Sequence, residues 1–301
     1  MLFYSPRYAI DIGPHVFPTQ KYRLVIERLL ERGVVRPEDV VEASPADWDD
    51  LALVHTREYL AKLRDGTMTP EDVAQLELPW SREMVEGFRV MVRGTIDAAS
   101  LACGLKGSLP SKFGTYCHLG GGLHHAFPNH GEGFCPFNDV AVAVRVLQRH
   151  GLERAAVVDL DVHHGNGTAF IFESDPRVFT FSMHQQHNYP MWKPRGSLDI
   201  GLADGTGDAT YLAELERALP RVVAHRPDCL FYLAGADPYE GDQLGGLRLT
   251  KDGLRRRDRM VVEAARAAVV PLVVTLAGGY ARNTGDTVDI HVGTIEEALA
   301  Q

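Results

Sequence analysis

The chain has few cysteines, and they show no pairing pattern. None belongs to a C-x-x-C pair, and wide stretches of sequence separate all four: Cys103, Cys117, Cys135 and Cys229. This spacing argues against a disulfide scaffold and against a zinc site built from cysteines. We therefore expect four reduced thiols.

The chain also lacks long apolar runs and a surplus of basic residues. No apolar run approaches the roughly 18 residues that a membrane helix needs, and the start MLFYSPRYAI does not resemble a signal peptide. A formal net charge of −9 argues against nucleic-acid binding, which requires clustered Lys and Arg. The one basic run, Arg255–Arg257, lies between Asp252 and Asp258, which predicts a solvated helix face without a function. We expect a soluble, cytoplasmic protein that binds neither nucleic acid nor membrane.

Nothing in the sequence divides it into parts. It contains no linker rich in Pro, Gly and Ser and no internal repeat, and 45% of its 301 residues are hydrophobic. We therefore predict one domain over residues 1–301.

Apolar runs that end abruptly in polar or glycine residues alternate with helical stretches. The expected strands are Ala155–Val158, Cys229–Leu233 and Leu272–Leu276. Helical periodicity is clear in Gln20–Arg32, Val85–Cys103, Asp139–Arg149, Tyr211–Ala224 and Lys251–Ala268. This alternation predicts an α/β fold with a central, mostly parallel sheet and helices on both faces.

The segment AAVVDLDVHHGNG, residues 155–167, is the most informative one. It places Asp159, Asp161 and His163 at positions i, i+2 and i+4. If the strand continues through them, all three side chains lie on one face, because successive residues alternate sides. Adjacent buried carboxylates are costly unless a cation lies between them, so the pattern indicates a metal site.

A third ligand, which is acidic, follows another strand. Asp237 comes directly after the run Cys229–Leu233, and ligands beyond strand ends meet at one edge of a parallel sheet. Asp161, His163 and Asp237 together suit zinc and leave coordination positions open for water and substrate. Such an open site is typical of hydrolysis by a metal-activated water.

Two further segments supply groups for acid–base chemistry. The segment GGGLHHA contains the adjacent pair His124 and His125, which suit a proton shuttle. Tyr280 follows two glycines at the end of a predicted strand, where its hydroxyl can donate a hydrogen bond to an oxyanion. These groups together indicate hydrolysis of an amide.

The motifs resemble a known family. GGGLHHA, GEGFCPFND, DLDVHHGNGT, LAGAD and LAGGY occur in the order used by zinc-dependent histone deacetylases and acetylpolyamine amidohydrolases. The segments FSMHQQHNYPMWKP and LADGTGD are most similar to class IV-like bacterial members, and the resemblance covers nearly the whole chain. It implies the arginase/deacetylase fold and removal of acetyl or longer acyl groups from N-acyl lysine or from small acylated amines.

The resemblance also implies individual functions for residues. It assigns one catalytic zinc ion to Asp161, His163 and Asp237, with His125 as general base and acid and Tyr280 as the hydroxyl that polarises the carbonyl. Asp159 would orient His124, the first histidine of the pair. The wall of a narrow substrate channel is assigned to Gly133 and Phe134, with Leu123 where relatives often have an aromatic residue. A structural potassium ion would bind the main chain of Asp159, Asp161, His163 and Met183 and the hydroxyl of Ser182.

One departure concerns the second histidine. Asn166 stands where many class I relatives have an aspartate beside that histidine. Because a neutral amide stabilises an imidazolium less than a carboxylate does, we expect a lower pKa for His125 than in those relatives. Asn166→Asp should then raise the acidic limb of the pH–rate profile.

The sequence leaves alternatives open. A protein with the same pocket can bind acylated ligands without turnover, and a ureohydrolase-like amidine hydrolase would use two manganese ions, although GGGLHHA does not provide the extra acidic ligands. Acyl length, the choice between zinc and iron, protein or small-molecule substrate and oligomeric state stay undetermined. The segment His187–Arg195 is expected to border the mouth of the pocket.

Overall fold

The sheet at the centre of the protein is entirely parallel. The computed structural model describes residues 1–104 and 114–300, and within them eight strands form one sheet in the order β2-β1-β3-β8-β7-β4-β5-β6. Each pair of neighbouring strands is parallel. The strands are β1 Leu2–Phe3, β2 Val40–Val41, β3 Thr115–His118, β4 Ala155–Asp159, β5 Val178–Gln185, β6 Leu198–Leu202, β7 Cys229–Leu233 and β8 Leu272–Thr275.

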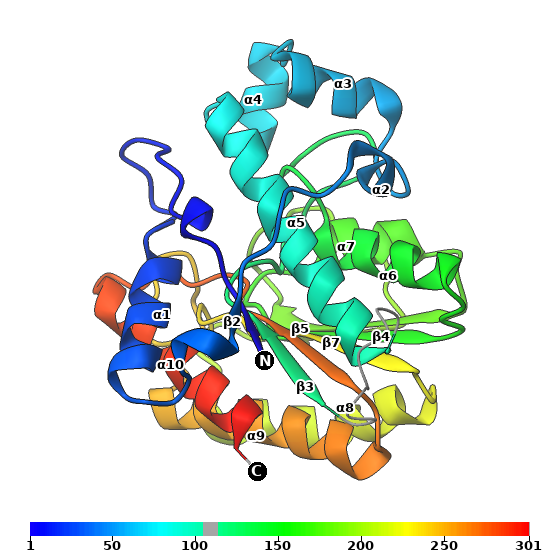
Figure 1. Cartoon of the computed structure of the whole chain (residues 1–301). Coiled ribbons are helices and arrows are strands. Elements are labelled where there is room, and N and C mark those ends of the chain that lie inside the picture. Colours follow the sequence, from blue (N-terminus) through cyan, green and yellow to red (C-terminus); the bar gives the residue numbers. More distant parts are fainter. Residues whose placement is uncertain (105–113, 301) are drawn as a thin grey trace.

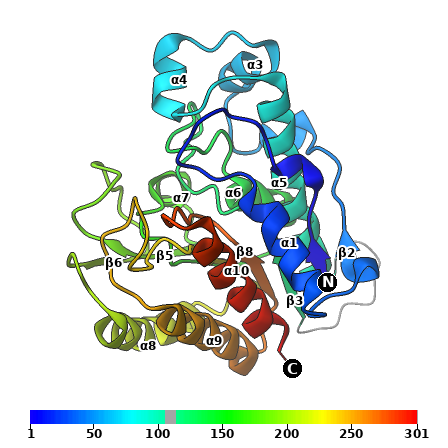
Figure 2. The same ribbon diagram turned by 90° about the vertical axis from the view of Figure 1, so that its left-hand side faces the viewer.

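Helices cover both faces of this sheet, which confirms the predicted fold class. Figure 1 shows α5, α6 and α7 on one side and α8 and α9 on the other, while α3 and α4 extend away from the sheet. Figure 2, turned by 90°, shows α1 beside α10. The helices are α1 Lys21–Glu31, α2 Trp48–Leu51, α3 Arg57–Asp65, α4 Pro70–Leu76, α5 Arg82–Ala102, α6 Asp139–Arg149, α7 Asn166–Phe172, α8 Asp208–Ala224, α9 Lys251–Ala268 and α10 Thr284–Leu299.

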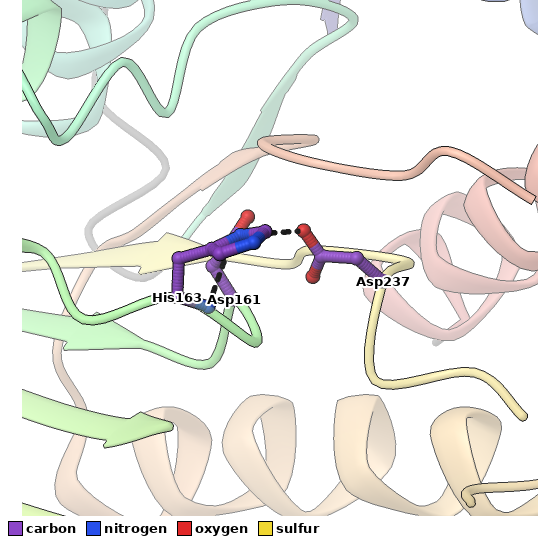
Figure 3. Close-up of side chains that lie close together, drawn as sticks. All are labelled: Asp161, His163 and Asp237. Atoms are coloured by element: carbon purple, nitrogen blue, oxygen red, sulfur yellow. Dashed lines mark hydrogen bonds and ion pairs between the residues drawn. The ribbon is translucent and has the colours of Figure 1, made fainter. Parts of the chain in front are cut away.

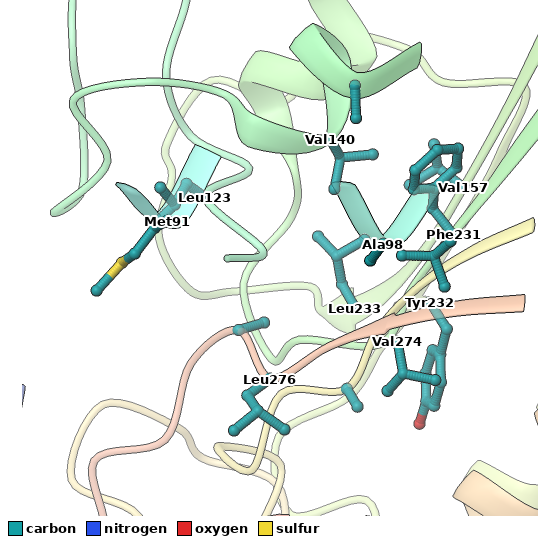
Figure 4. Packing of buried hydrophobic residues seen from close by; sticks show 14 of the residues in the cluster. Met91, Ala98, Leu123, Val140, Val157, Phe231, Tyr232, Leu233, Val274 and Leu276 are labelled. Atoms are coloured by element: carbon teal, nitrogen blue, oxygen red, sulfur yellow. The ribbon is translucent and has the colours of Figure 1, made fainter. Parts of the chain in front are cut away.

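The central strands are buried along their whole length and consist mainly of apolar residues, because helices cover both of their faces. Every residue of β4, β7 and β8 is buried. In Figure 4, Phe231 and Leu233 point toward Ala98 of α5 and Val140 of α6, whereas Tyr232 points to the opposite face. This alternation, with apolar residues on both sides, is what a doubly covered parallel strand requires.

The five helical stretches expected from periodicity correspond to α1, α5, α6, α8 and α9. In the described ranges, no helix has both the length and the hydropathy needed to span a bilayer.

The prediction of a solvated basic run on α9 is wrong for its last member. Arg255 and Arg256 are exposed, but Arg257 and the following Asp258 are buried. Arg257 Nε donates to Asp258 Oδ1 at 2.9 Å, and its Nη1 donates to the carbonyl oxygen of Gly235 at 2.6 Å. The charge pattern along the helix could not reveal partners that lie on another segment.

Candidate active site

The candidate residues lie at the carboxyl edge of four neighbouring strands. The four strands are neighbours in the sheet, in the order β3, β8, β7 and β4. The loop after β3 contains His124 and His125, and the loop after β8 contains Tyr280. The loop after β7 contains Asp237, and the loop after β4 contains Asp161 and His163. Parallel strands end at the same edge, so groups from four distant parts of the chain meet there.

The expectation that one extended strand presents Asp159, Asp161 and His163 is wrong in its geometry. β4 ends at Asp159, and the chain then turns. Asp159 Oδ1 accepts the backbone N–H of Asp161 at 3.2 Å, and Asp161 Oδ1 accepts that of His163 at 2.9 Å. Aspartates that bond the backbone two residues ahead favour turns over strands. The turn separates Asp159 from the other two side chains.

Asp161, His163 and Asp237 form one compact, buried group. His163 Nδ1 lies 3.0 Å from Asp161 Oδ1 and 3.4 Å from Asp237 Oδ2. One ligand atom from each residue lies within 4.8 Å of the others. Figure 3 shows both carboxylates, from two different loops, turned toward the imidazole ring.

Backbone N–H groups of two loops, those after β4 and β8, hold the two carboxylates in place. Val162 N donates to Asp237 Oδ1 and Gly278 N donates to Asp161 Oδ2, each at 2.8 Å. Position 278 must be a glycine, because a Cβ there would lie only 2.0 Å from Asp237 Oδ2. The remaining oxygen, Asp237 Oδ2, is buried and has no hydrogen-bond partner.

The electrostatics of this group call for a cation. Burial and the charge of Asp161 raise the pKa of Asp237 to about 7. Burial would lower the pKa of His163, but its hydrogen bond to Asp161, its close contact with Asp237 and the charges of both carboxylates raise it to about 10. Two carboxylates therefore compete for one proton on the imidazole. One nitrogen and two carboxylate ligands with an unpartnered oxygen suit a divalent ion such as Zn²⁺.

The two tandem histidines have different partners. His124 Nδ1 lies 2.7 Å from Asp159 Oδ2, and His125 Nδ1 lies 2.7 Å from Asn166 Oδ1 at the start of α7. Burial would lower the pKa of His124, but the charges of Asp159 and Asp161 raise it to about 9.

His125 shows the opposite shift. Burial, followed by the positive charges of His124 and His163, lowers its pKa well below the usual range. The pair thus combines one imidazole that favours the cation with one that favours the neutral form.

Tyr280 lies beside the imidazole of His163. Its backbone N–H donates to Asp242 Oδ2 at 2.7 Å, and its ring lies 6.4 Å from that of His163, centroid to centroid. Burial and the charges of Asp161 and Asp237 raise the pKa of its phenol, which keeps the hydroxyl protonated and able to donate. Lys21, buried nearby, donates to the carbonyl oxygen of Ala277 at 2.7 Å and lies 5.7 Å from the centre of the Tyr280 ring.

His125, His163 and Tyr280 border a pocket of about 180 Å³. Its lining consists of Glu77, His125, Gly133, Phe134, His163, Asn188, Tyr189, Leu244 and Tyr280. Gly133 and Phe134, expected as channel wall, are in this set. Leu123 is not, and instead lines a smaller cavity of about 20 Å³ behind the pocket together with Phe17, His124 and Asp161.

The residues assigned to potassium lie on neighbouring segments. Ser182 and Met183 belong to β5, and Ser182 pairs in register with Asp159 of β4. The Ser182 hydroxyl contacts His184 Nδ1 at 3.0 Å. The loop containing Asp161 and His163 also packs on β5, because Gln185 N donates to the carbonyl oxygen of Val162 at 2.9 Å.

Sequence reasoning missed several residues of the site. Glu77 and Leu244 line the pocket but belong to no motif, so no local pattern could have indicated them. Asn188 also lines the pocket, and it belongs to the segment His187–Arg195 that was expected at the pocket mouth. Tyr189 belongs to the segment expected at the pocket mouth, whereas Met191 and Trp192 of that segment are 96% and 59% exposed. Glu132 belongs to the quoted motif GEGFCPFND, and its carboxylate contacts Asn166.

Known proteins resemble this chain over most of its length. Residues 15–295 match the model of the histone deacetylase domain. An uncharacterized protein of Picosynechococcus sp. is 44% identical over 96% of this chain and 94% of its own length.

Relatives that have a functional name are less similar to this chain. Histone deacetylase 2 of Arabidopsis thaliana is 31% identical over 94% of this chain and 75% of its own length. The acetoin utilization protein AcuC of Staphylococcus aureus is 29% identical, over 88% and 72% respectively. The crystal structure of the HDA15 HD domain superposes with a TM-score of 0.82 at 25% identity, covering all of this chain and 88% of that one.

These matches confirm the arginase/deacetylase fold and the expectation of a hydrolase of the deacetylase class. The chain belongs to the histone deacetylase family.

Proposed function

We propose that this protein is a metal-dependent amidohydrolase that removes acyl groups from N-acyl lysine side chains or from small acylated amines. The observation that carries the proposal is the convergence of the Asp161–His163–Asp237 group, His125 and Tyr280 on one pocket. Hydrolysis of an amide needs these three elements together: a cation site, a base and a hydrogen-bond donor for the oxyanion.

Asp161, His163 and Asp237 would hold the ion, and the orphaned oxygen of Asp237 supports that assignment. When bound, a divalent ion there supplies Lewis acidity that polarises the acyl carbonyl and lowers the pKa of water. The proposed potassium ligands are the Ser182 hydroxyl and the main-chain carbonyl oxygens of Asp159, Asp161, His163 and Met183.

His125 is the proposed general base. It is neutral, and its Nδ1 faces Asn166 Oδ1, so the lone pair is on Nε2. Nε2 takes the proton of the attacking water and returns it to the nitrogen of the leaving amine. A group with a lowered pKa is suited to accept and then release a proton within one turnover.

His124 and Tyr280 stabilise negative charge. The carboxylate of Asp159 keeps His124 oriented and cationic, which offsets the charge that develops at the carbonyl oxygen. The Tyr280 hydroxyl donates a hydrogen bond to that same oxygen. Donors that are already in place need no reorganisation during the reaction.

The pocket walls suit an extended side chain with an acylated end. Phe134, Tyr189 and Leu244 offer apolar surface to a methylene chain, and Glu77 places a carboxylate where an N–H or a cation can bind. The name of one relative, a histone deacetylase, supports acetylated substrates.

Release of free amine from acyl-lysine peptides and acetylpolyamines tests the proposal. We expect turnover by the native protein with one zinc ion per chain, and its loss in His125→Ala and Tyr280→Phe with zinc retained. Tyr239→Phe, on a tyrosine outside the pocket, is the control.

The same experiment decides between the alternatives. Bound zinc without turnover of any substrate would favour a protein that only binds acylated ligands. Two manganese ions per chain would favour the ureohydrolase chemistry, although the described residues provide one candidate metal group.

A further inference from the structure

Asn166 lies between the imidazole of His125 and a carboxylate that the sequence did not reveal. Asn166 Nδ2 donates to Glu132 Oε1 at 2.6 Å, while Asn166 Oδ1 lies 2.7 Å from His125 Nδ1. The three side chains form a continuous chain of hydrogen bonds, and Asn166 itself is buried.

This chain determines the direction of each hydrogen bond. An ionised carboxylate only accepts hydrogen bonds, so Asn166 must turn its NH₂ group toward Glu132. The amide oxygen then faces His125, and because that oxygen only accepts, His125 Nδ1 must carry a proton. In a neutral imidazole the lone pair is then on Nε2.

Glu132 is itself held rigidly and in its ionised form. Its backbone N–H donates to the carbonyl oxygen of Cys135 at 3.2 Å and its carbonyl oxygen accepts from Cys135 N at 2.9 Å. Its Oε2 lies 3.4 Å from His130 Nε2. Burial would raise the pKa of Glu132, but hydrogen bonds from His130, Asn166 and Tyr189 hold it below the usual range.

Tyr189 joins the same arrangement from the pocket wall. Burial and the neighbouring carboxylate of Glu132 raise the pKa of the Tyr189 phenol. The edge of the Tyr189 ring meets the ring of His125 at 5.0 Å between centroids, with an interplanar angle of 83°. Glu132 thus interacts with both Asn166 and Tyr189, which contact His125 directly.

We propose that Glu132 is a positioning residue: through Asn166 it holds His125 in the tautomer whose lone pair is on Nε2, and through Tyr189 it holds the ring in place. The inference rests on the proposed function of His125 as base. A directly bonded aspartate would impose the same tautomer, so the Asn166–Glu132 pair performs that task with the charge moved one side chain away.

Glu132 also changes the result expected of Asn166→Asp. In the native background the new carboxylate would face the Glu132 carboxylate at hydrogen-bond distance, where like charges repel. In a Glu132→Ala background the same aspartate would accept from His125 Nδ1 without that repulsion. The effect of the substitution should therefore reverse between the two backgrounds.

The test combines steady-state kinetics with a spectroscopic measurement on the zinc-loaded protein. We expect Glu132→Ala to lower kcat by roughly 10- to 100-fold, the usual range for residues that orient a catalytic group from behind. KM should stay within about threefold, because Glu132 does not line the pocket. Glu132→Gln keeps an acceptor for Asn166, so its kcat should fall less than that of Glu132→Ala. It replaces the alanine variant in the test if that variant does not fold.

Two further results separate positioning from a general structural effect. Long-range ¹H–¹⁵N spectra should show His125 protonated only at Nδ1 in the native protein and as a tautomer mixture in Glu132→Ala. Asn166→Asp should lower kcat in the native background and raise it in the Glu132→Ala background. The control is Glu173→Gln, on an exposed glutamate at the other end of α7. It should change neither kcat nor the His125 tautomer.

The inference is overturned if Glu132→Ala keeps native kcat and an unchanged His125 tautomer, or if Asn166→Asp changes kcat by the same factor in both backgrounds. A native protein without turnover would instead contradict the proposed function. In that case the tautomer spectra alone would decide the inference about Glu132.

Discussion

The protein buries charged side chains in two neighbouring regions, and the two differ in how their charges are balanced. In the site, two carboxylates face the imidazole of His163, and Asp237 Oδ2 is left without a hydrogen-bond partner. Behind the same loops, Arg257 pairs with Asp258, whose other oxygen accepts from Thr294 at 2.7 Å.

The difference distinguishes a functional cluster from a structural one. Arg257 donates to the carbonyl oxygens of Leu160 and Gly235, in the loops that lead to Asp161 and Asp237. The structural cluster is neutralised by its own residues, whereas the site needs a cation from outside. Buried groups without partners are rare in native proteins, and they concentrate where a ligand completes the arrangement.

The largest effect should follow from removing a ligand. Asp237→Asn keeps the acceptor for Val162 N but removes the charge, so we expect loss of zinc and a fall in activity of about 10³-fold or more, since a bound ion contributes several kcal/mol to catalysis. Without metal, Asp237→Asn should be at least as stable toward unfolding as the native protein. The reason is that the substitution removes a buried charge that lacks a full set of partners.

Zinc content, amine release and thermal unfolding after chelation measure these results. The exposed Asp252→Asn is the matched control. Retention of one tightly bound zinc ion by Asp237→Asn would remove Asp237 from the ligand set.

Breaking the structural cluster should instead affect stability. Arg257→Met leaves Asp258 buried and unpaired and removes the donor of two carbonyl oxygens, so we expect a loss of about 3–5 kcal/mol in the free energy of unfolding. Urea denaturation measures it. The exposed neighbour gives the control, because Arg256→Met should stay within about 0.5 kcal/mol of the native value. If both substitutions changed the free energy of unfolding equally, the structural function assigned to the Arg257–Asp258 cluster would be wrong.

Tyr280→Phe should affect catalysis and leave stability unchanged. Loss of one oxyanion donor costs about 10²- to 10³-fold in kcat in other enzymes. We expect a loss of that size with zinc content and unfolding free energy as in the native protein. A variant with native kcat would assign the oxyanion donor to another group.

The smallest effect concerns a buried histidine of the scaffold. His55 Nδ1 lies 3.0 Å from the carbonyl oxygen of Phe127 and its Nε2 accepts from Asn138 N at 3.0 Å, an arrangement that only the neutral ring can make. Burial lowers its pKa to about 4.

Between pH 6.5 and about 4 the unfolded chain therefore binds a proton at His55 that the folded protein does not. Stability should fall as the pH decreases through this window, by up to about 1.4 kcal/mol per pH unit from this group. Urea titrations at several pH values should show a shallower dependence in His55→Gln, and an unaltered one in the exposed His150→Gln. Identical slopes in all three proteins would show that His55 does not contribute.

Much of the fold follows from local sequence patterns. The buried strands β4, β7 and β8 read as short apolar runs that end in polar or glycine residues, and five helices follow from their periodicity. The strand β2 at one edge of the sheet and its neighbour β1 contain only two residues each, too few for a pattern to be visible. The helices α2 and α7, of four and seven residues, are similarly too short.

The candidate site, like the fold, could be predicted only in part from the sequence. Asp161, His163 and Asp237 could be chosen from their positions after apolar runs, but the extended geometry assumed for the first two was wrong, because aspartate side chains turn the backbone beyond β4. Arg257 was misread since its partners Leu160 and Gly235 are 97 and 22 residues away. Local charge patterns carry no information about such contacts.

The sequence by itself determined the kinds of residue at the site, their order and the strand ends to which they belong, because alternation and apolar runs are local properties of the chain. The tertiary structure alone decided that Asp237 keeps an unpartnered oxygen, that Tyr189 meets His125 edge-on, and that Glu132 stands behind Asn166. Each depends on atoms from distant segments meeting within a few ångströms, and only the packing of the whole fold brings those segments together.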